Sequence, residues 1–170
     1  MTAIRAATPA DAPTVFALIN AAYSVESGDI PPAFKRTTRF LAPAELLPQL
    51  AAGAILLAHA DDGAVQGVLA FELQRDAAAA GGALRAHFGP FAVAAAHRGA
   101  GVGAALLAAL AQRARAEGCA SLDAEVVNHR HDLFPLYLGR LGFRVVGRAP
   151  FPAPERLSRP AHFVCIRRTL

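Results

Sequence analysis

The pattern of apolar and polar residues predicts a chain that mixes strands with amphipathic helices. Short apolar or alternating runs bounded by glycine, proline and aspartate are typical of strands, and apolar side chains three and four residues apart are typical of helices. The predicted strands are residues 3–6, 55–60, 65–73, 84–93, 121–127, 143–146 and 162–168. The predicted helices are residues 8–23, 44–52, 101–117 and 132–141. Because helices separate several of the strands, we expect one α/β domain over residues 1–170, a mixed sheet with helices on both faces.

One predicted strand, residues 84–93, carries Gly89-Pro90 in its interior. Proline has no backbone N–H and cannot donate to a neighbouring strand. We therefore expect this strand to bulge, or to stay unpaired on one side, at that point.

Length and composition fit a folded domain. Of the 170 residues, 54% are hydrophobic and 18% are charged, which excludes a disordered chain. The most apolar predicted helix, residues 101–117, is too short to span a bilayer and contains Arg113 and Arg115. The segment from Met1 to Pro13 lacks the basic and apolar regions of a signal peptide, so we expect a cytoplasmic protein with no membrane partner.

The charged and metal-binding residue types point to no special partner. The formal net charge of +4 comes from arginines scattered along the chain, which is typical of a solvated surface and predicts no nucleic-acid partner. Cys119 and Cys165 lie far apart in sequence and match no metal-ligand spacing. The polar run from His129 to Asp132 lacks a matching third site, so we expect no metal.

The most informative segment is a glycine-rich turn between a predicted strand and a predicted helix. Val93 ends the strand, and Arg98-Gly-Ala-Gly101-Val-Gly103 opens the helix. Glycines let backbone N–H groups point into one concavity, and a helix N-terminus adds partial positive charge. Such a turn suits a diphosphate group.

Two other interpretations of this turn are open. The glycines can form a tight turn that binds nothing. Alternatively, Gly99-x-Gly101-x-x-Ala104 matches a dinucleotide-binding fingerprint, with Asp123 near the expected acidic position. That fingerprint follows its strand directly, whereas residues 94–98 intervene here, and little chain remains for the rest of such a sheet.

The same turn carries a resemblance to a known family. Arg98-x-x-Gly101-x-Gly103 after Phe91-Ala-Val93 resembles the coenzyme A-binding motif of the GNAT superfamily of N-acetyltransferases. Asn128 and Leu136-Tyr137-x-x-x-Leu141-Gly142-Phe143 look like its second signature, and Ile4-Arg5-x-Ala7-Thr8-x-x-Asp11 is similar to its usual opening. The resemblance covers nearly the whole chain. It implies a GNAT-like central mixed sheet of about seven strands, with a splayed strand pair that holds coenzyme A.

The resemblance also implies which residues bind acetyl-coenzyme A. The strand end would pair with the pantetheine arm, the turn would hold the pyrophosphate, and Asn128 would hydrogen-bond the pantetheine. A main-chain N–H of the strand end would polarise the thioester carbonyl. The expected cofactor-binding residues are Phe91, Ala92, Val93, Arg98, Gly99, Ala100, Gly101, Val102, Gly103, Ala104, Asn128 and Tyr137.

Candidate catalytic residues follow from the chemistry of acyl transfer to an amine. Tyr137 matches the family tyrosine that protonates the leaving thiolate, and a phenol is protonated at neutral pH. A free amine is mostly protonated at pH 7, so a base must remove its proton. His87 has a suitable side chain. Glu72 and Glu125 are alternatives, and a chain of water molecules is equally open.

These expectations describe an N-acetyltransferase that moves an acetyl group from acetyl-coenzyme A to a primary amine of a small molecule or peptide by direct attack. An alternative is a catalytically silent domain that binds acyl-coenzyme A as a sensor or regulator. The acceptor would be selected by residues 23–43, 75–82 and 151–160. Many members of the superfamily are homodimers, so the resemblance also implies a homodimer.

Overall fold

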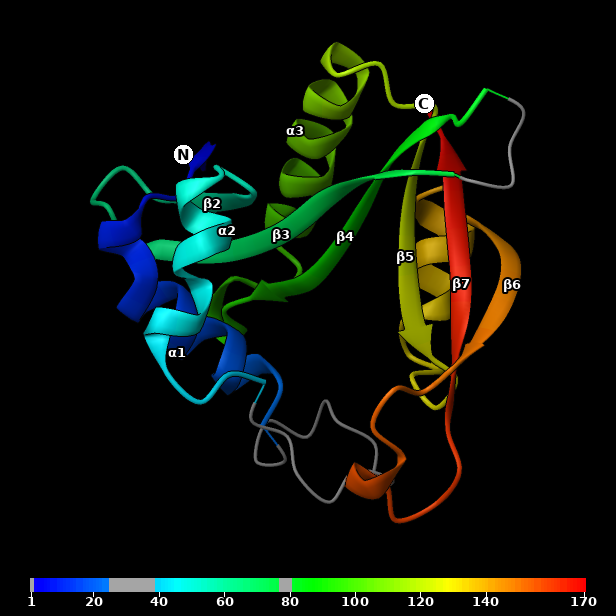
Figure 1. Cartoon of the computed structure of the whole chain (residues 1–170). Coiled ribbons are helices and arrows are strands. Elements are labelled where there is room, and N and C mark those ends of the chain that lie inside the picture. The colour runs from blue at the N-terminus through cyan, green and yellow to red at the C-terminus, as the bar shows by residue number, and fades with distance from the viewer. Residues whose placement is uncertain (1, 25–38, 77–80) are drawn as a thin grey trace.

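Seven strands form one sheet in the computed structural model, which describes residues 2–24, 39–76 and 81–170 (Figure 1). The strands are β1 (Ala3–Ala6), β2 (Ile55–His59), β3 (Val65–Arg75), β4 (Leu84–Val93), β5 (Ser121–Val127), β6 (Arg144–Pro150) and β7 (His162–Thr169). Their order across the sheet is β1-β2-β3-β4-β5-β7-β6. The neighbours β4 and β5 are parallel, and the other neighbours are antiparallel. The predicted mixed sheet is confirmed.

Helices cover both faces of this sheet. On one face, called here the α1 face, lie α1 (Ala12–Ala22) and α2 (Leu47–Ala51). On the other, the α3 face, lie α3 (Val102–Ala116) and the short helix η5 (Pro135–Arg140) (Figure 1). The described residues also contain short 3-10 helices: η1 (Pro9–Asp11), η3 (Pro43–Leu46), η4 (Ala95–His97) and η6 (Pro154–Arg156). Alternation along the strands divides their apolar side chains between the two faces.

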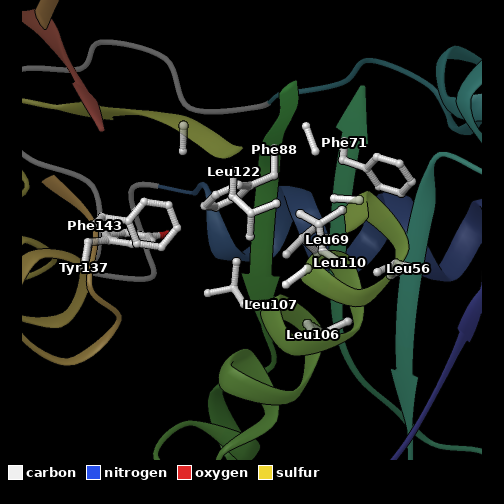
Figure 2. Close-up of a cluster of buried hydrophobic side chains, with 14 of the residues drawn as sticks. Leu56, Leu69, Phe71, Phe88, Leu106, Leu107, Leu110, Leu122, Tyr137 and Phe143 are labelled. Atoms are coloured by element: carbon white, nitrogen blue, oxygen red, sulfur yellow. The ribbon is translucent and has the colours of Figure 1, made fainter. Parts of the chain in front are cut away.

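The larger apolar cluster fills the space between α3 and the sheet. Figure 2 shows the leucines of α3 among side chains from β2 to β5, with Tyr137 and Phe143 at one end of the cluster. The rings of Tyr137 and Phe143 lie edge to face, with centroids 5.6 Å apart. The Phe88 ring is 6.3 Å from the Tyr137 ring, so the end of this cluster reaches the middle of β4.

Close contact between α3 and the sheet depends on Gly67 in β3. A Cβ atom at this position would lie 3.1 Å from the Ala92 carbonyl oxygen and 3.1 Å from side-chain carbons of Val102 and Leu106. We expect Gly67→Ala to lower the free energy of unfolding by about 1–3 kcal/mol, because strand and helix must move apart. Urea denaturation measures this, with Gly147→Ala as the control, since nothing lies within 4 Å of a Cβ there. Equal midpoints for the two variants would contradict the prediction.

Two elements differ from the prediction. The helix expected over residues 132–141 is η5, a π-helix in which the Leu141 N–H donates to the Leu136 carbonyl at 3.0 Å. It begins later than predicted because hydrogen-bonded turns occupy the preceding residues, and Pro135 lies in its first turn, where no N–H is needed. The strand expected over residues 143–146 is longer, because β6 pairs along β7 as far as Pro150 opposite His162.

The sheet opens between β4 and β5. Their register contains Arg85–His87 opposite Ser121–Asp123, and the described remainder of both strands carries no further pairing between them. On its other edge β4 bulges against β3 at Gly89-Pro90, which is a cis peptide. The bulge predicted from Gly89-Pro90 and the splayed strand pair are both confirmed.

Candidate active site

The glycine-rich turn presents free N–H groups at the start of α3. Gly99 and Gly101 have φ angles of +78° and +84°, in the left-handed region that favours glycine. The first helical bond runs from the Ala105 N–H to the Gly101 carbonyl at 3.0 Å. The N–H groups of residues 102–104 therefore have no acceptor within the helix, and they share the positive end of its dipole. This arrangement can bind an anion such as a diphosphate.

Gly103 brings this turn against the open edge of β4. A Cβ atom on Gly103 would lie 3.2 Å from the Phe91 ring, so a larger residue would push the helix away from the strand. Arg98, which is exposed, folds back so that its Nε is 3.4 Å from the Val93 carbonyl oxygen. A guanidinium group thus lies where the strand end meets the turn.

The main chain of β4 points into the opening at alternate residues. Ala94 donates its N–H to Gln66 at 2.9 Å, and Ala92 lies opposite Val68, so both face β3. In an antiparallel pair the residues between them, Phe91 and Val93, direct their N–H and C=O groups to the other side. Those groups line the opening beside β5, where an extended ligand can add to the strand edge.

Tyr137 lies at the same opening, on the α3 face. Its side chain is 7% exposed and packs against Phe143 and Phe88, the residue just before the bulge (Figure 2). Burial raises the pKa of the Tyr137 phenol well above its usual range, and the neighbouring Tyr23 acts in the same direction, while Arg130 opposes them. The phenol is therefore protonated at neutral pH.

The three base candidates lie on the α1 face of the sheet. His87 is the last residue of β4 that pairs with β5. It lies opposite Glu72 on the neighbouring strand β3, with 3.9 Å between His87 Nδ1 and Glu72 Oε1. The Glu72 side chain is 65% exposed and also accepts from the Gln74 amide. His87 and Glu125 line one cavity of about 190 Å³, and Glu72 lines another of about 440 Å³ beside Gly89. The structure thus places His87 and Glu125 at the start of the opening, with Glu72 one strand away on β3.

Asn128 fastens the end of β5 to the start of β7. Its N–H donates to the His162 carbonyl at 3.0 Å, and its Oδ1 accepts from the His162 N–H at 2.9 Å. The Nδ2 group is the part of this amide that can still donate to a ligand. The neighbouring His129 ring contacts the Pro160 carbonyl at 2.9 Å, and Arg130 pairs with Asp132 at 2.8 Å.

A buried ion network beside the site was not predicted. Asp123 of β5 accepts from Arg167 at 2.7 Å, from Arg85 at 3.0 Å and from Ser121 at 2.7 Å. Burial alone raises the pKa of Asp123, but the hydrogen bonds from Arg167 and Ser121 and the charges of both arginines outweigh it, so the pKa is lowered. The assignment of Asp123 to a ribose, in the dinucleotide interpretation, is wrong because its carboxylate ties β4, β5 and β7 together.

We expect Asp123→Asn to lower the free energy of unfolding by about 2 kcal/mol at neutral pH, because both arginines lose a charged hydrogen-bond acceptor and keep only Asp76, whose carboxylate is 3.7 Å from Arg85 and 3.8 Å from Arg167. A lowered folded-state pKa contributes stability above the unfolded-state value of about 4, and that contribution is lost as the pH falls through the folded-state value. The difference in the free energy of unfolding between Asp123→Asn and the natural protein should therefore be smaller at about pH 3 than at pH 7. Urea denaturation at both values measures it, with Glu125→Gln as the control for an exposed carboxylate. A difference that is independent of pH would refute this.

The comparisons with known proteins agree with this geometry. Residues 19–143 match the model of the acetyltransferase (GNAT) family, and the chain belongs to that family. Its sheet and helices match solved structures over nearly their whole length. One is ribosomal-protein-alanine N-acetyltransferase from Brucella melitensis, with 22% identity, 99% of each chain covered and a TM-score of 0.73. Another is yncA from Salmonella typhimurium, solved with its cofactor acetyl-CoA. It shares 21% identity, the match covers 100% of this chain and 94% of that chain, and the TM-score is 0.74.

NAA60 from Arabidopsis thaliana, in complex with a bisubstrate analogue, shares the fold at 15% identity. The match covers 99% of this chain and 98% of that chain, with a TM-score of 0.71. No curated protein matches the chain. Membership of this family makes the protein an acyltransferase. Within residues 2–24, 39–76 and 81–170, no helix has the length and apolar content needed to cross a membrane.

Proposed function

We propose that the protein transfers an acetyl group from acetyl-coenzyme A to a primary amine of a small molecule or peptide. The observation that carries the proposal is the opening between β4 and β5, into which the main chain of Phe91 and Val93 points, and which ends at the free N–H groups of the α3 turn. A long, thin ligand with a diphosphate near one end fits both features.

Different residues would bind different parts of acetyl-coenzyme A, the acetyl donor. The Phe91 C=O and the main chain of Val93 would hydrogen-bond the pantetheine amides along the open edge, which leaves the Phe91 N–H for the thioester carbonyl, and Ala92 between them keeps the strand paired to β3. The turn from Arg98 to Ala104 would hold the diphosphate through its N–H groups and the Arg98 guanidinium. Asn128 would contribute its Nδ2 group.

Acetyl-coenzyme A supplies an acyl group activated as a thioester. In direct transfer, the amine nitrogen forms a bond to the carbonyl carbon, the carbon–sulfur bond breaks, and the sulfur takes a proton. Tyr137 would donate that proton or a hydrogen bond to the sulfur. Because burial raises its pKa, complete transfer costs about 1.4 kcal/mol for each unit by which its pKa exceeds that of the thiol. Transfer would therefore accompany cleavage of the carbon–sulfur bond rather than precede it.

The amine must lose a proton before or during attack. His87 and Glu72 form a pair on the α1 face at the start of the opening, and Glu125 lines the same cavity as His87. We propose His87 as the base, assisted by Glu72 across the strand pair. A homodimer and a cytoplasmic location, expected from the sequence, belong to the same proposal.

The test has a binding arm and a turnover arm. Calorimetry with acetyl-coenzyme A measures donor binding, and thiol release over a panel of amines, amino acids, polyamines and peptides measures transfer. Binding together with acetylation of one acceptor class supports the proposal. Binding without transfer to any acceptor would support the silent sensor instead, and no binding would overturn both.

A further inference from the structure

Both tyrosines of the chain reach the opening, from the two faces of the sheet. Tyr137 comes from η5 on the α3 face, and Tyr23 caps the C-terminal end of α1 on the α1 face. The main-chain N–H of Phe91 donates to the Tyr23 hydroxyl oxygen, with 3.5 Å between N and O.

Arg39 and Phe40 lie against the end of α1 that carries Tyr23. The Asn20 side chain accepts from the N–H groups of Arg39 at 2.9 Å and Phe40 at 3.0 Å, and it donates to the Phe40 carbonyl at 3.1 Å. These three bonds hold residues 39–40 against α1. The Arg39 guanidinium carbon is then 5.5 Å from the centroid of the Tyr23 ring, a cation–π distance.

The partner of Tyr23 is informative because of where Phe91 lies. Phe91 is the first residue after the bulge, and its N–H points into the opening rather than toward β3. An N–H in this position can donate to a thioester carbonyl oxygen, and such an oxygen would lie about 2.9 Å from the nitrogen. The Tyr23 oxygen, at 3.5 Å, is now at the end of the same N–H. A carbonyl oxygen bound to the Phe91 N–H would therefore be a neighbour of the Tyr23 hydroxyl.

We propose that Tyr23 is the second hydrogen-bond donor to the thioester carbonyl oxygen, beside the Phe91 N–H. The inference rests on the proposed function and adds a residue to it. When the amine attacks, the carbon–nitrogen bond forms and the carbonyl electron pair moves onto the oxygen. Tyr23 O–H and Phe91 N–H stabilise that negative charge until the pair returns and the carbon–sulfur bond breaks. The positive charge of Arg39 over the ring makes the hydroxyl a stronger donor.

The test compares Tyr23→Phe with Tyr137→Phe. Phenylalanine keeps the ring beneath Arg39 and removes only the hydroxyl. We expect Tyr23→Phe to lower kcat by about 100-fold, the typical cost of losing one oxyanion donor, with little change in the KM for acetyl-coenzyme A. Arg39→Gln should give a smaller loss in the same direction.

A spectroscopic measurement separates an electronic role from a structural one and needs no acceptor. Infrared difference spectra with acetyl-coenzyme A carrying ¹³C at the thioester carbonyl report how strongly that carbonyl is polarised. The stretching frequency should fall on binding to the natural protein, fall less in Tyr23→Phe, and fall fully in Tyr137→Phe, because the hydroxyl removed there is the one proposed to face the sulfur.

The outcomes distinguish this inference from the proposed function. If the natural protein binds and transfers acetyl groups, but Tyr23→Phe has the same kcat and carbonyl frequency, the role of Tyr23 is wrong and the proposed function stands. If the natural protein does not bind acetyl-coenzyme A, both fail. Thermal melting of the two variants tests whether a lower rate reflects unfolding, and unchanged melting temperatures are expected.

Discussion

Tyr137→Phe is expected to lower kcat and kcat/KM by about 100-fold, with the KM for acetyl-coenzyme A nearly unchanged. A positioned general acid contributes about 100-fold to 10,000-fold, and a thiolate is a good leaving group, so we expect the lower end of that range. The loss should appear equally in kcat and kcat/KM because the sulfur gains negative charge only in the transition state.

The stability of the same variant should move little or rise. Tyr137 lies among Phe88 and Phe143, and phenylalanine preserves these ring contacts while removing a buried hydroxyl (Figure 2). A change in the free energy of unfolding below about 1 kcal/mol would exclude unfolding as the cause of a lower rate.

The raised pKa of Tyr137 also predicts how the rate of the natural enzyme depends on pH. Because ionisation of the phenol is shifted upward, the natural enzyme should show no alkaline loss of kcat from this residue in the pH range where an ordinary tyrosine ionises.

An unchanged rate in Tyr137→Phe would remove the tyrosine from the mechanism and leave the protonation of the thiolate to solvent. Phe143→Leu, which disturbs the same aromatic group without touching a hydroxyl, serves as the packing control. We expect that control to lose stability and to retain most of its kcat.

The parts of the site that sequence predicts are those set by local chemistry. Proline without an N–H, and a glycine beside it, require an irregular strand at residues 89–90 wherever that strand is placed. Glycines at 99 and 101 permit left-handed backbone at the entrance to a helix, and both have positive φ. A helix was predicted over residues 132–141, but the π form of η5 was not, because its hydrogen bonds span one residue more than the helical spacing on which the prediction relied.

The parts that sequence does not predict depend on pairing between distant strands. Asp123 meets Arg167 only because β5 and β7 are antiparallel in a register that sets them opposite each other. An acidic residue on one strand and a basic residue on another gave no sign of that register in advance. The contact between Tyr23 and Phe91 joins residues 68 apart in sequence, on different elements. The scarcity of tyrosine, two in the whole chain, was the one sequence feature that pointed to Tyr23.

The glycine turn carries the second large effect. Gly101 begins α3 in the left-handed region, and nothing lies within 4 Å of a Cβ atom built on it. Asparagine and aspartate adopt this backbone more readily than other side chains, so Gly101→Asn and Gly101→Asp should be strained equally. Both have the same shape, and they differ by one negative charge at the place where the diphosphate is expected.

We expect Gly101→Asp to bind acetyl-coenzyme A about 100-fold more weakly than Gly101→Asn. Two unit charges about 4 Å apart repel by about 4 kcal/mol at an effective dielectric constant of about 20, and screening at this exposed position reduces the effect to about 3 kcal/mol. Calorimetry at low and high salt measures both the difference and its decrease with salt. Without ligand, Gly101→Asp should have a higher melting temperature than Gly101→Asn, because a carboxylate at a helix N-terminus interacts favourably with the helix dipole. If the diphosphate binds at this turn, the aspartate charge raises the melting temperature of the free protein and lowers its affinity for acetyl-coenzyme A. Equal affinities of the two variants for acetyl-coenzyme A would place the diphosphate elsewhere.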